Sequence, residues 1–440
     1  MSTNAPSTAG EHVENAVNRH SNPSDLRITD MRLAVVLGNL PYPIIKLETN
    51  QGVFGLGEVR DGGHAENALQ FKHMLLGQNP CDVDMIFRRI KRFGGPGREG
   101  GGVSGIEIAL WDLVGKVYGV PCYQLLGGKY RERVRIYGDT PAPEKLDAEG
   151  YGKAVKSRLD LGLTFIKFDI KPALFEATED GYVGTKTRYE NDFYKRWRAP
   201  GSGPGARLTD RGIARAAEIV GAMREAVGPE VSLCIDHFGE GASTEDECIR
   251  LSRGLEPYSL AWMEDPMPWH DIAGHKRVTD ASVVPIAGGE DLYLWDGFRE
   301  ACETRAFDIL HPDLLTSGGM LETKRIADYG ELYGQATALH CACSPIGFMA
   351  NVHCAAAIGS LLAVEHHGLD LPWYTDLVSG LDPDYMSEGY VTVPTAPGLG
   401  LDLVEEAVEA HLMEPGTMWQ STEAWNTPKL DIWHPARKLR

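Results

Sequence analysis

Three carboxylates at nearly equal intervals constrain the fold of this chain more than any other feature. Each closes an apolar stretch: Asp236 follows VSLCI, Glu264 follows SLAWM and Glu290 follows SVVPIAGG, at intervals of 28 and 26 residues. Because a strand–helix–strand unit takes about 30 residues, this spacing predicts successive parallel strands that each end in an acid. In a closed β/α barrel such strand ends converge on one face, where the chemistry takes place.

Carboxylates that converge on one place repel one another unless a cation joins them. Three hard oxygen ligands with no Cys or His partner suit Mg²⁺, so Asp236, Glu264 and Glu290 are predicted to bind this ion. Each acid taken singly has an alternative explanation, because acidic residues just after a strand often cap the next helix. The shared period of all three favours the metal site.

The chain from residue 134 onward alternates short apolar runs with helical stretches. The runs occupy 134–138, 164–170, 231–236, 259–264, 282–289, 307–310, 336–340 and 360–365. Such near-continuous apolar runs are typical of parallel strands covered on both faces. Eight of them in alternation with helices predict a closed α/β barrel. The alternative, a doubly wound open sheet, lacks a GxGxxG at any strand–helix turn.

The residues before the barrel segment have a mixed pattern. Residues 27–60 are rich in β-branched and apolar side chains, and a helical pattern begins at Ser104 and ends at Gly119. The predicted organisation is a loose tail over 1–26, an α+β domain over 27–133, the barrel over 134–370, and a segment over 371–440 that returns to the α+β domain. One connection, 171–210, is long for a barrel. Two roles are possible for it: it covers the substrate, or it contacts another subunit.

Lys167 and Asp169 lie in FIKFD at the end of the second predicted strand. A spacing of two puts both side chains on one face of a strand, here the barrel interior. Lys167 is predicted to stabilise a substrate oxyanion while Asp169 positions it or carries a proton. The alternative is a Lys–Asp ion pair that closes the end of the barrel.

His340 ends the seventh predicted strand, and Asp313 lies just past the sixth. Neighbouring barrel strands place these residues side by side, so the carboxylate would fix the imidazole tautomer and raise its basicity. Glu365 ends the eighth strand and is predicted to hydrogen-bond the substrate or its enolate; its alternative is an ion pair with Lys167.

The composition indicates where the protein is located and which kinds of partner it lacks. Lys and Arg number 43 against 62 Asp and Glu, and this net charge of −19 argues against a nucleic-acid partner or a basic membrane-binding face. No apolar run is long enough to span a membrane, and the polar N-terminus lacks the apolar core of a signal peptide. The eight Cys include no CxxC pair, which favours reduced thiols and a cytoplasmic location.

Taken together, these motifs resemble the enolase superfamily, and specifically its mandelate racemase/muconate lactonizing-like branch, from about residue 27 onward. Besides the acids and the Lys167–Asp169 pair, the resemblance rests on KLETNQGVFGLGEV, GIEIALWDLVGKVYGVPCYQLLGG, PDLLTSGGM, LHCACSPIG and APGLGLDL. It implies a modified TIM barrel, (β/α)₇β, with an α+β capping domain formed from both termini. It also implies a homo-oligomer.

The resemblance assigns roles to the site residues. It implies that Mg²⁺ binds the three acids and that His340 is the base and Asp313 its partner. Lys167 matches the first Lys of the family's KxK motif, and Glu365 matches its eighth-strand Glu. Two departures matter. Asp169 stands where racemases of the family have a Lys base, and His237 directly follows Asp236, where strand alternation turns it away from the metal. His237 is therefore only a candidate acid, available if a bulge re-aims it.

The predicted reaction is dehydration of an acid sugar, an aldonate or aldarate. His340 removes the proton α to the carboxylate, Mg²⁺ and Lys167 stabilise the enediolate, and the 3-OH leaves as water to give a 2-keto-3-deoxy acid. His340, Asp169 or His237 would protonate the leaving group. A racemase, epimerase or cycloisomerase with the same enolate is the alternative, followed by a catalytically silent metal-binding paralogue.

Arg60 is expected either to meet a distal carboxylate or to pair with Asp61.

Overall fold

The computed structural model describes residues 22–170, 174–175, 178–184, 206–236 and 244–428. Its N-terminal region begins with an antiparallel sheet in the order β1 (Ile28–Leu37), β2 (Pro41–Thr49) and β3 (Phe54–Glu58). A turn with Gly52 at φ +80° connects β2 and β3. Four helices follow: α2 (Glu66–Leu69), α3 (Lys72–Leu75), α4 (Val83–Ile90) and α5 (Gly101–Tyr118).

Helix α5 packs directly on strand β3, and small residues allow the close approach. A Cβ on Gly57 would lie 2.0 Å from the Gly105 carbonyl oxygen, so only glycine fits at this position. The helix ends as predicted at Gly119, whose φ of +70° is a left-handed conformation that suits glycine. The short helix α6 (Cys122–Leu125) then leads to the barrel.

Eight parallel strands close into a barrel, as the sequence predicted. They are β4 (Arg133–Gly138), β5 (Phe165–Asp169), β8 (Ser232–Asp236), β9 (Met263–Glu264), β10 (Ile286–Gly288), β11 (Ile309–Leu310), β12 (Ala336–Leu339) and β13 (Leu361–His366). Each pairs in parallel with the next, and β13 pairs with β4 to complete the circle. The open-sheet alternative is therefore wrong.

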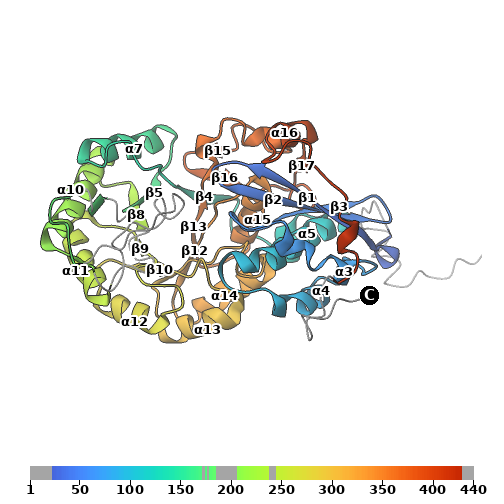
Figure 1. The fold of residues 1–440 in the computed structure, drawn as a ribbon, viewed down its shortest axis with the longest axis horizontal. Helices are drawn as coiled ribbons and strands as arrows, with labels where there is room; N and C mark the ends of the chain where they lie inside the picture. The colour runs from blue at the N-terminus through green and yellow to red at the C-terminus, as the bar shows by residue number, and fades with distance from the viewer. Residues whose placement is uncertain (1–21, 171–173, 176–177, 185–205, 237–243, 429–440) are drawn as a thin grey trace, which may run out of the picture.

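Seven helices alternate with these strands and surround the barrel (Figure 1). They are α7 (Ala148–Asp160), α10 (Asp210–Val227), α11 (Glu245–Leu255), α12 (Ile272–Ala281), α13 (Leu294–Thr304), α14 (Met320–Glu331) and α15 (Pro345–Ala356). Several begin at a side-chain cap, and α11 has a complete capping box formed by Thr244 and Glu247. Among the described residues, the 3₁₀ turns Gly368–Asp370 and Thr375–Leu377 come directly after β13 in place of an eighth barrel helix, so the architecture is (β/α)₇β.

Aromatic side chains fill the interior of the barrel. The Trp262 ring lies 4.9 Å from that of Phe165 and 5.3 Å from that of Tyr137, measured between centroids, and all three are buried. This apolar layer leaves the charged residues at the carboxyl ends of the strands, where they converge on one mouth.

The C-terminal segment contacts both parts of the chain. Strand β16 (Tyr390–Thr392) pairs with β4 and with β15 (Met386–Ser387), and β14 (Val378–Ser379) pairs with β17 (Asp402–Leu403). After α16 (Glu405–Ala410), the Met413 N–H donates to the Val35 carbonyl of β1 over 2.8 Å.

The described part of the long 171–210 connection forms a two-stranded hairpin, β6 (Tyr182–Gly184) with β7 (Ala206–Leu208). Most of the connection lies outside the described residues. Among the described residues, no helix combines the length and apolar character needed to cross a membrane.

Candidate active site

A cavity of about 310 Å³ lies between the barrel mouth and the N-terminal region. The barrel strands contribute Lys167, Asp169, Asp236, Glu290 and His340 to its wall. The N-terminal region and the residues that follow β4 and β13 contribute Asn39, Leu40, Asp61, Arg98, Asp139, Thr140, Pro141, Ala142, His367 and Asp370, and Ala342 lies beside His340. Residues from distant parts of the sequence therefore enclose one site.

Lys167 is the cation at the centre of the barrel mouth. Its Nζ atom lies 2.7 Å from Asp236 Oδ2, 2.8 Å from Glu264 Oε1 and 2.7 Å from Glu365 Oε1. One positive charge thus faces three carboxylates, and all four side chains are buried. Burial, together with the charge of Asp236, raises the pKa of Glu264 well above its usual value. The cluster holds an excess of negative charge that a divalent cation would neutralise.

The donors in this cluster fit a hard metal ion. Asp236, Glu264 and Glu290 follow one another at the ends of the neighbouring strands β8, β9 and β10, and they offer only oxygen atoms. Ligand atoms of Glu264 and Glu290 also come within 4.8 Å of an imidazole nitrogen of His311. Asp236 and Glu290 line the cavity, whereas His311 is not among its lining residues. Asp236 and Glu290 are therefore placed to meet a metal that also meets substrate, whereas Glu264, like His311, does not line the cavity.

His311 lies beside Glu264, but its Nδ1 atom makes no hydrogen bond to any described residue. Its Nε2 atom lies 2.5 Å from the Tyr137 hydroxyl, and its Nδ1 atom lies 3.3 Å from Glu264 Oε1. Burial lowers the pKa of His311 to about 3, so the ring is neutral. The sequence analysis missed this residue, although the HPD motif after the sixth strand placed a second His beside Asp313.

The structure brings Asp313 and His340 together. His340 Nδ1 lies 2.5 Å from Asp313 Oδ2, and the Leu315 N–H donates to the same carboxylate over 2.6 Å. His340 Nε2 faces Glu290 Oε2 at 3.1 Å. Burial opposes a charge on the ring, but Glu290, Glu365 and Asp313 outweigh it and raise the pKa of His340. The imidazole is thus oriented by one carboxylate, with its second nitrogen directed toward the acids of the mouth.

Asp169 lies two residues beyond Lys167, and both line the cavity as the strand period predicted. Asp169 is 9% exposed, so it can meet a bound molecule. His237, the other candidate acid, lies outside the described residues.

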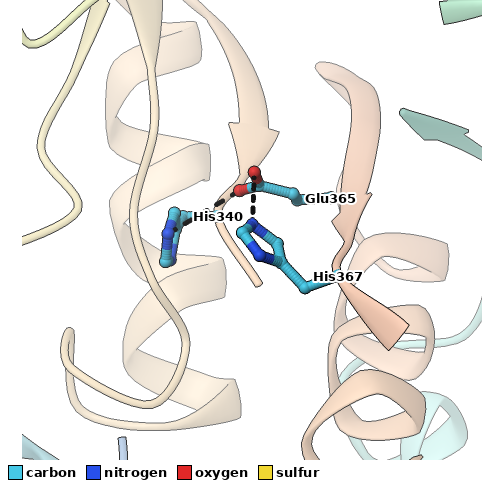
Figure 2. Close-up of side chains that lie close together, drawn as sticks. All are labelled: His340, Glu365 and His367. Atoms are coloured by element: carbon cyan, nitrogen blue, oxygen red, sulfur yellow. Dashed lines mark hydrogen bonds and ion pairs between the residues drawn. The ribbon is translucent and has the colours of Figure 1, made fainter. Parts of the chain in front are cut away.

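Glu365 connects the lysine to two imidazoles. Figure 2 shows its carboxylate between His340 and His367. His367 Nε2 lies 2.9 Å from Glu365 Oε1, the oxygen that also meets Lys167. The ion pair with Lys167 that was expected as an alternative is present, and Glu365 itself is not among the residues that line the cavity.

Arg60 pairs with Asp61, which is the second of its two expected roles. Its side chain is fully buried, with Nε 3.1 Å from Asp61 Oδ1 and Nη2 3.1 Å from Glu290 Oε1. It therefore fixes Glu290 and does not line the cavity. Arg98 does line the cavity, but it pairs with Asp61 at 3.2 Å and with Asp291 at 3.4 Å.

The thiols of Cys341 and Cys343 lie 2.8 Å apart and are buried. Among the described residues no third and fourth ligand joins them, so the geometry does not favour a structural zinc site.

Sequence comparisons find known relatives of both the N-terminal region and the barrel. Residues 153–407 match the model of the enolase C-terminal domain-like family, and residues 16–127 match that of the mandelate racemase/muconate lactonizing enzyme N-terminal domain. The chain is 36% identical to a D-xylonate dehydratase of Haloferax volcanii, over 90% of this chain and 91% of that protein. It is 31% identical to a D-galactonate dehydratase of Ralstonia nicotianae, over 83% of this chain and 90% of that protein.

Solved structures give the same result for the fold. A mandelate racemase/muconate lactonizing enzyme-like protein from Rubrobacter xylanophilus superposes with a TM-score of 0.78 and 32% identity. The match covers 90% of this chain and 99% of that one. Both the barrel and the N-terminal region therefore have counterparts in one known architecture.

Proposed function

This chain belongs to the mandelate racemase/muconate lactonizing enzyme family of the enolase superfamily, and from this premise we propose that it is a Mg²⁺-dependent dehydratase of aldonates, sugar acids with a single carboxylate. The observation that carries the proposal is the Asp313–His340 pair beside a carboxylate-rich cavity. Such a pair provides an oriented base for a proton next to a carboxylate. Relatives named as D-xylonate and D-galactonate dehydratases support the same reaction class.

Asp236, Glu264 and Glu290 would hold the metal, as the charge excess around Lys167 supports. When bound, Mg²⁺ would supply Lewis-acid stabilisation of the negative charge that develops on the substrate carboxylate. Family members use a divalent metal, and the all-oxygen ligand set favours Mg²⁺ among them.

The residues of the chain have distinct tasks in the reaction. His340 Nε2 accepts the proton from C2, and Asp313 keeps the ring oriented through Nδ1. The Lys167 ammonium stabilises the enediolate as its charge develops, which lowers the barrier because the interaction strengthens in the transition state. Asp169 positions the substrate from the same strand, and Glu365 hydrogen-bonds it. Loss of the 3-OH as water and tautomerisation then give a 2-keto-3-deoxy acid.

The charges of the cavity favour one substrate carboxylate over two. Arg60 is buried away from the cavity, and Arg98 is paired with Asp61 and Asp291. The residues that follow β4 and β13 add Asp139 and Asp370 to the cavity wall, and Arg158 is engaged by Asp370 at 2.5 Å. Within the described residues, a second carboxylate would therefore meet acids and not an unpaired arginine.

The test is a panel of five- and six-carbon aldonates with Mg²⁺, beginning with D-xylonate, scored by formation of 2-keto-3-deoxy acids. Aldarates of the same stereochemistry serve as matched controls. We expect one or a few aldonates to react, no aldarate to react, and EDTA to abolish the activity. Activity on aldarates alone would contradict the cavity argument. Deuterium exchange at C2 without keto acid would instead indicate a racemase or epimerase.

The His340→Asn variant tests the base. It should lose C2 proton exchange by at least about 10²-fold, because general base catalysis contributes about 10²–10⁴. Its Mg²⁺ affinity should stay close to that of the wild type. A variant with full turnover would show that the base lies elsewhere.

A further inference from the structure

Dehydration requires two proton transfers, and the residues described so far account for one. His340 takes the C2 proton, but the hydroxyl on C3 leaves poorly unless it is protonated as its bond to carbon breaks. An acid that stays protonated near neutral pH and reaches the same cavity is needed. The residues that follow β13 include such a side chain.

His367 lines the cavity two residues beyond Glu365. Strand alternation explains its position: Glu365 and His367 point toward the mouth, whereas His366 between them packs outward on Phe348 with ring centroids 4.2 Å apart. The rings of His340 and His367 lie 6.2 Å apart, measured between centroids, with Glu365 between them (Figure 2). This distance allows one ring to meet the proton on C2 while the other meets the oxygen on C3, since each transfer needs a reach of about 3 Å.

Carboxylates on two sides keep His367 positively charged. Its Nε2 atom hydrogen-bonds Glu365 at 2.9 Å, and its Nδ1 atom lies 3.7 Å from Asp139 Oδ2, beyond hydrogen-bond distance. Burial and the charge of Lys167 oppose the imidazolium, but Asp139 and Glu365 outweigh them and raise the pKa of His367 to about 9. The His367 side chain is 19% exposed and lines the cavity, so it can meet a ligand.

The Asn39 side chain adds a link to the N-terminal region. Its Nδ2 atom donates to the His367 carbonyl over 2.7 Å. Since Asn39 also lines the cavity, the loop between β1 and β2 lies next to His367 in the cavity wall.

We propose that His367 is the general acid that protonates the leaving hydroxyl, an inference that rests on the proposed dehydration. The C2–H electron pair forms the enediolate as its proton passes to His340 Nε2. That pair then forms the C2–C3 double bond as the C3–O bond breaks, and the Nδ1 proton of His367 passes to the departing oxygen. Water leaves, His367 becomes neutral, and the enol tautomerises to the 2-keto-3-deoxy acid.

A metal ion bound by the two imidazoles and Glu365 is the competing explanation, because their ligand atoms lie within 4.8 Å of one another. The Lys167 ammonium argues against it. Its Nζ atom lies 2.7 Å from Glu365 Oε1, the same oxygen that accepts from His367. A cation at this position would repel both the lysine and a charged His367.

The experiment compares His367→Gln with wild type on the aldonate that the panel identifies, D-xylonate being tried first. We expect keto-acid formation to fall by about 10²–10⁴-fold, while C2 deuterium exchange persists because His340 is unchanged. A 3-deoxy-3-fluoro analogue should reduce the loss to less than about tenfold, because fluoride leaves without full protonation. His270→Gln, at an exposed position, is the matched control and should match wild type.

The outcomes separate this inference from the proposed function. If wild type dehydrates no aldonate, the proposed function fails. If wild type is active and His367→Gln is equally active, or Asp169→Asn instead shows the dependence on leaving group, the assignment to His367 is overturned. Loss of both exchange and dehydration in folded His367→Gln would also overturn it, as would zinc binding that the substitution removes.

A second variant keeps the test informative if His367→Gln does not fold. Asp139→Asn removes one of the two carboxylates that stabilise the imidazolium, so the basic limb of the kcat profile should move to lower pH. Glu149→Gln, on the exposed surface of α7, is its control. A basic limb that stays in place would contradict the proposal.

Discussion

At the scale of the residue, Asp313 shows how one carboxylate can set the chemistry of another side chain. It accepts from the Leu315 N–H, which fixes its own position, and it contacts His340 Nδ1 at 2.5 Å. The Arg60 Nε atom lies 3.4 Å away on another side. The Leu315 N–H and the Arg60 side chain therefore fix the position of Asp313 together. Asp313 in turn fixes the orientation of the His340 ring.

Asp313→Asn should lower kcat by about 10²-fold or more, because the amide no longer stabilises the imidazolium that forms when His340 takes a proton. Thermal unfolding should change little, since the amide keeps the shape of the carboxylate. Steady-state kinetics beside the melting curve checks this. An unchanged kcat would remove Asp313 from the catalytic pair.

His367 also predicts a pH dependence of stability. Its pKa in the folded protein is raised to about 9, above the ordinary value of about 6.5 for an unfolded chain. The stabilisation is therefore fully present below pH 6.5 and is lost as the pH rises through 9. Urea unfolding at pH 6 and pH 9.5 should show a loss on the order of 2 kcal/mol that is absent from His367→Gln. Equal pH dependence in both proteins would show that the imidazolium is not stabilised in the fold.

At the scale of the element, buried acids of the N-terminal region cap barrel helices. Glu58, at the end of β3, accepts from the Ser344 N–H at 2.9 Å and the Gly347 N–H at 3.1 Å, at the start of α15. Glu107 of α5 accepts from the Met320 N–H at 2.7 Å, at the start of α14. Two helix N-termini therefore depend on side chains that are more than 200 residues away in sequence.

Glu58→Ala should destabilise the protein by about 2–4 kcal/mol, because it leaves buried N–H groups of α15 without an acceptor. The free energy of unfolding in urea measures the effect. Glu230→Ala, at an exposed position after α10, should change it by less than about 0.5 kcal/mol. Equal stabilities of the two variants would show that the cap contributes nothing measurable.

At the scale of the whole molecule, the barrel concentrates negative charge in a chain that already carries a net charge of −19. Lys167 neutralises only part of the cluster formed by Asp236, Glu264 and Glu365. Metal binding to the folded state alone would add stability in proportion to the logarithm of the metal concentration.

Millimolar Mg²⁺ should therefore raise the melting temperature by a few degrees, and EDTA should reverse the change. In Glu264→Gln the rise should be lost, whereas Glu230→Gln should retain it. Calorimetric titration provides the direct affinity. A melting temperature indifferent to Mg²⁺ in wild type would refute the three-carboxylate site.

Local sequence order was enough to predict the barrel. The eight apolar runs and the acids at their ends have the spacing that β/α units impose, and burial on both faces makes such runs readable without tertiary information. Alternation within strands also predicted that Lys167 and Asp169 share a face. The metal ligands, the base and its partner remain predictions that the geometry and the relatives support.

Tertiary packing decided what strand order alone left open. The choice of His367 over His366 as the ring at the cavity depends on how β13 is rotated in the closed barrel. The charge of His367 depends on Asp139, which follows β4 and is far away in sequence. Arg60 could not be assigned to a substrate or to a structural role until its burial among Asp61, Glu290 and Asp313 was known. The period of the strands and the fold could be predicted from residue order, because they follow from local hydrophobic patterning. Only the folded chain determined which charges face one another, because that depends on distances between residues remote in sequence.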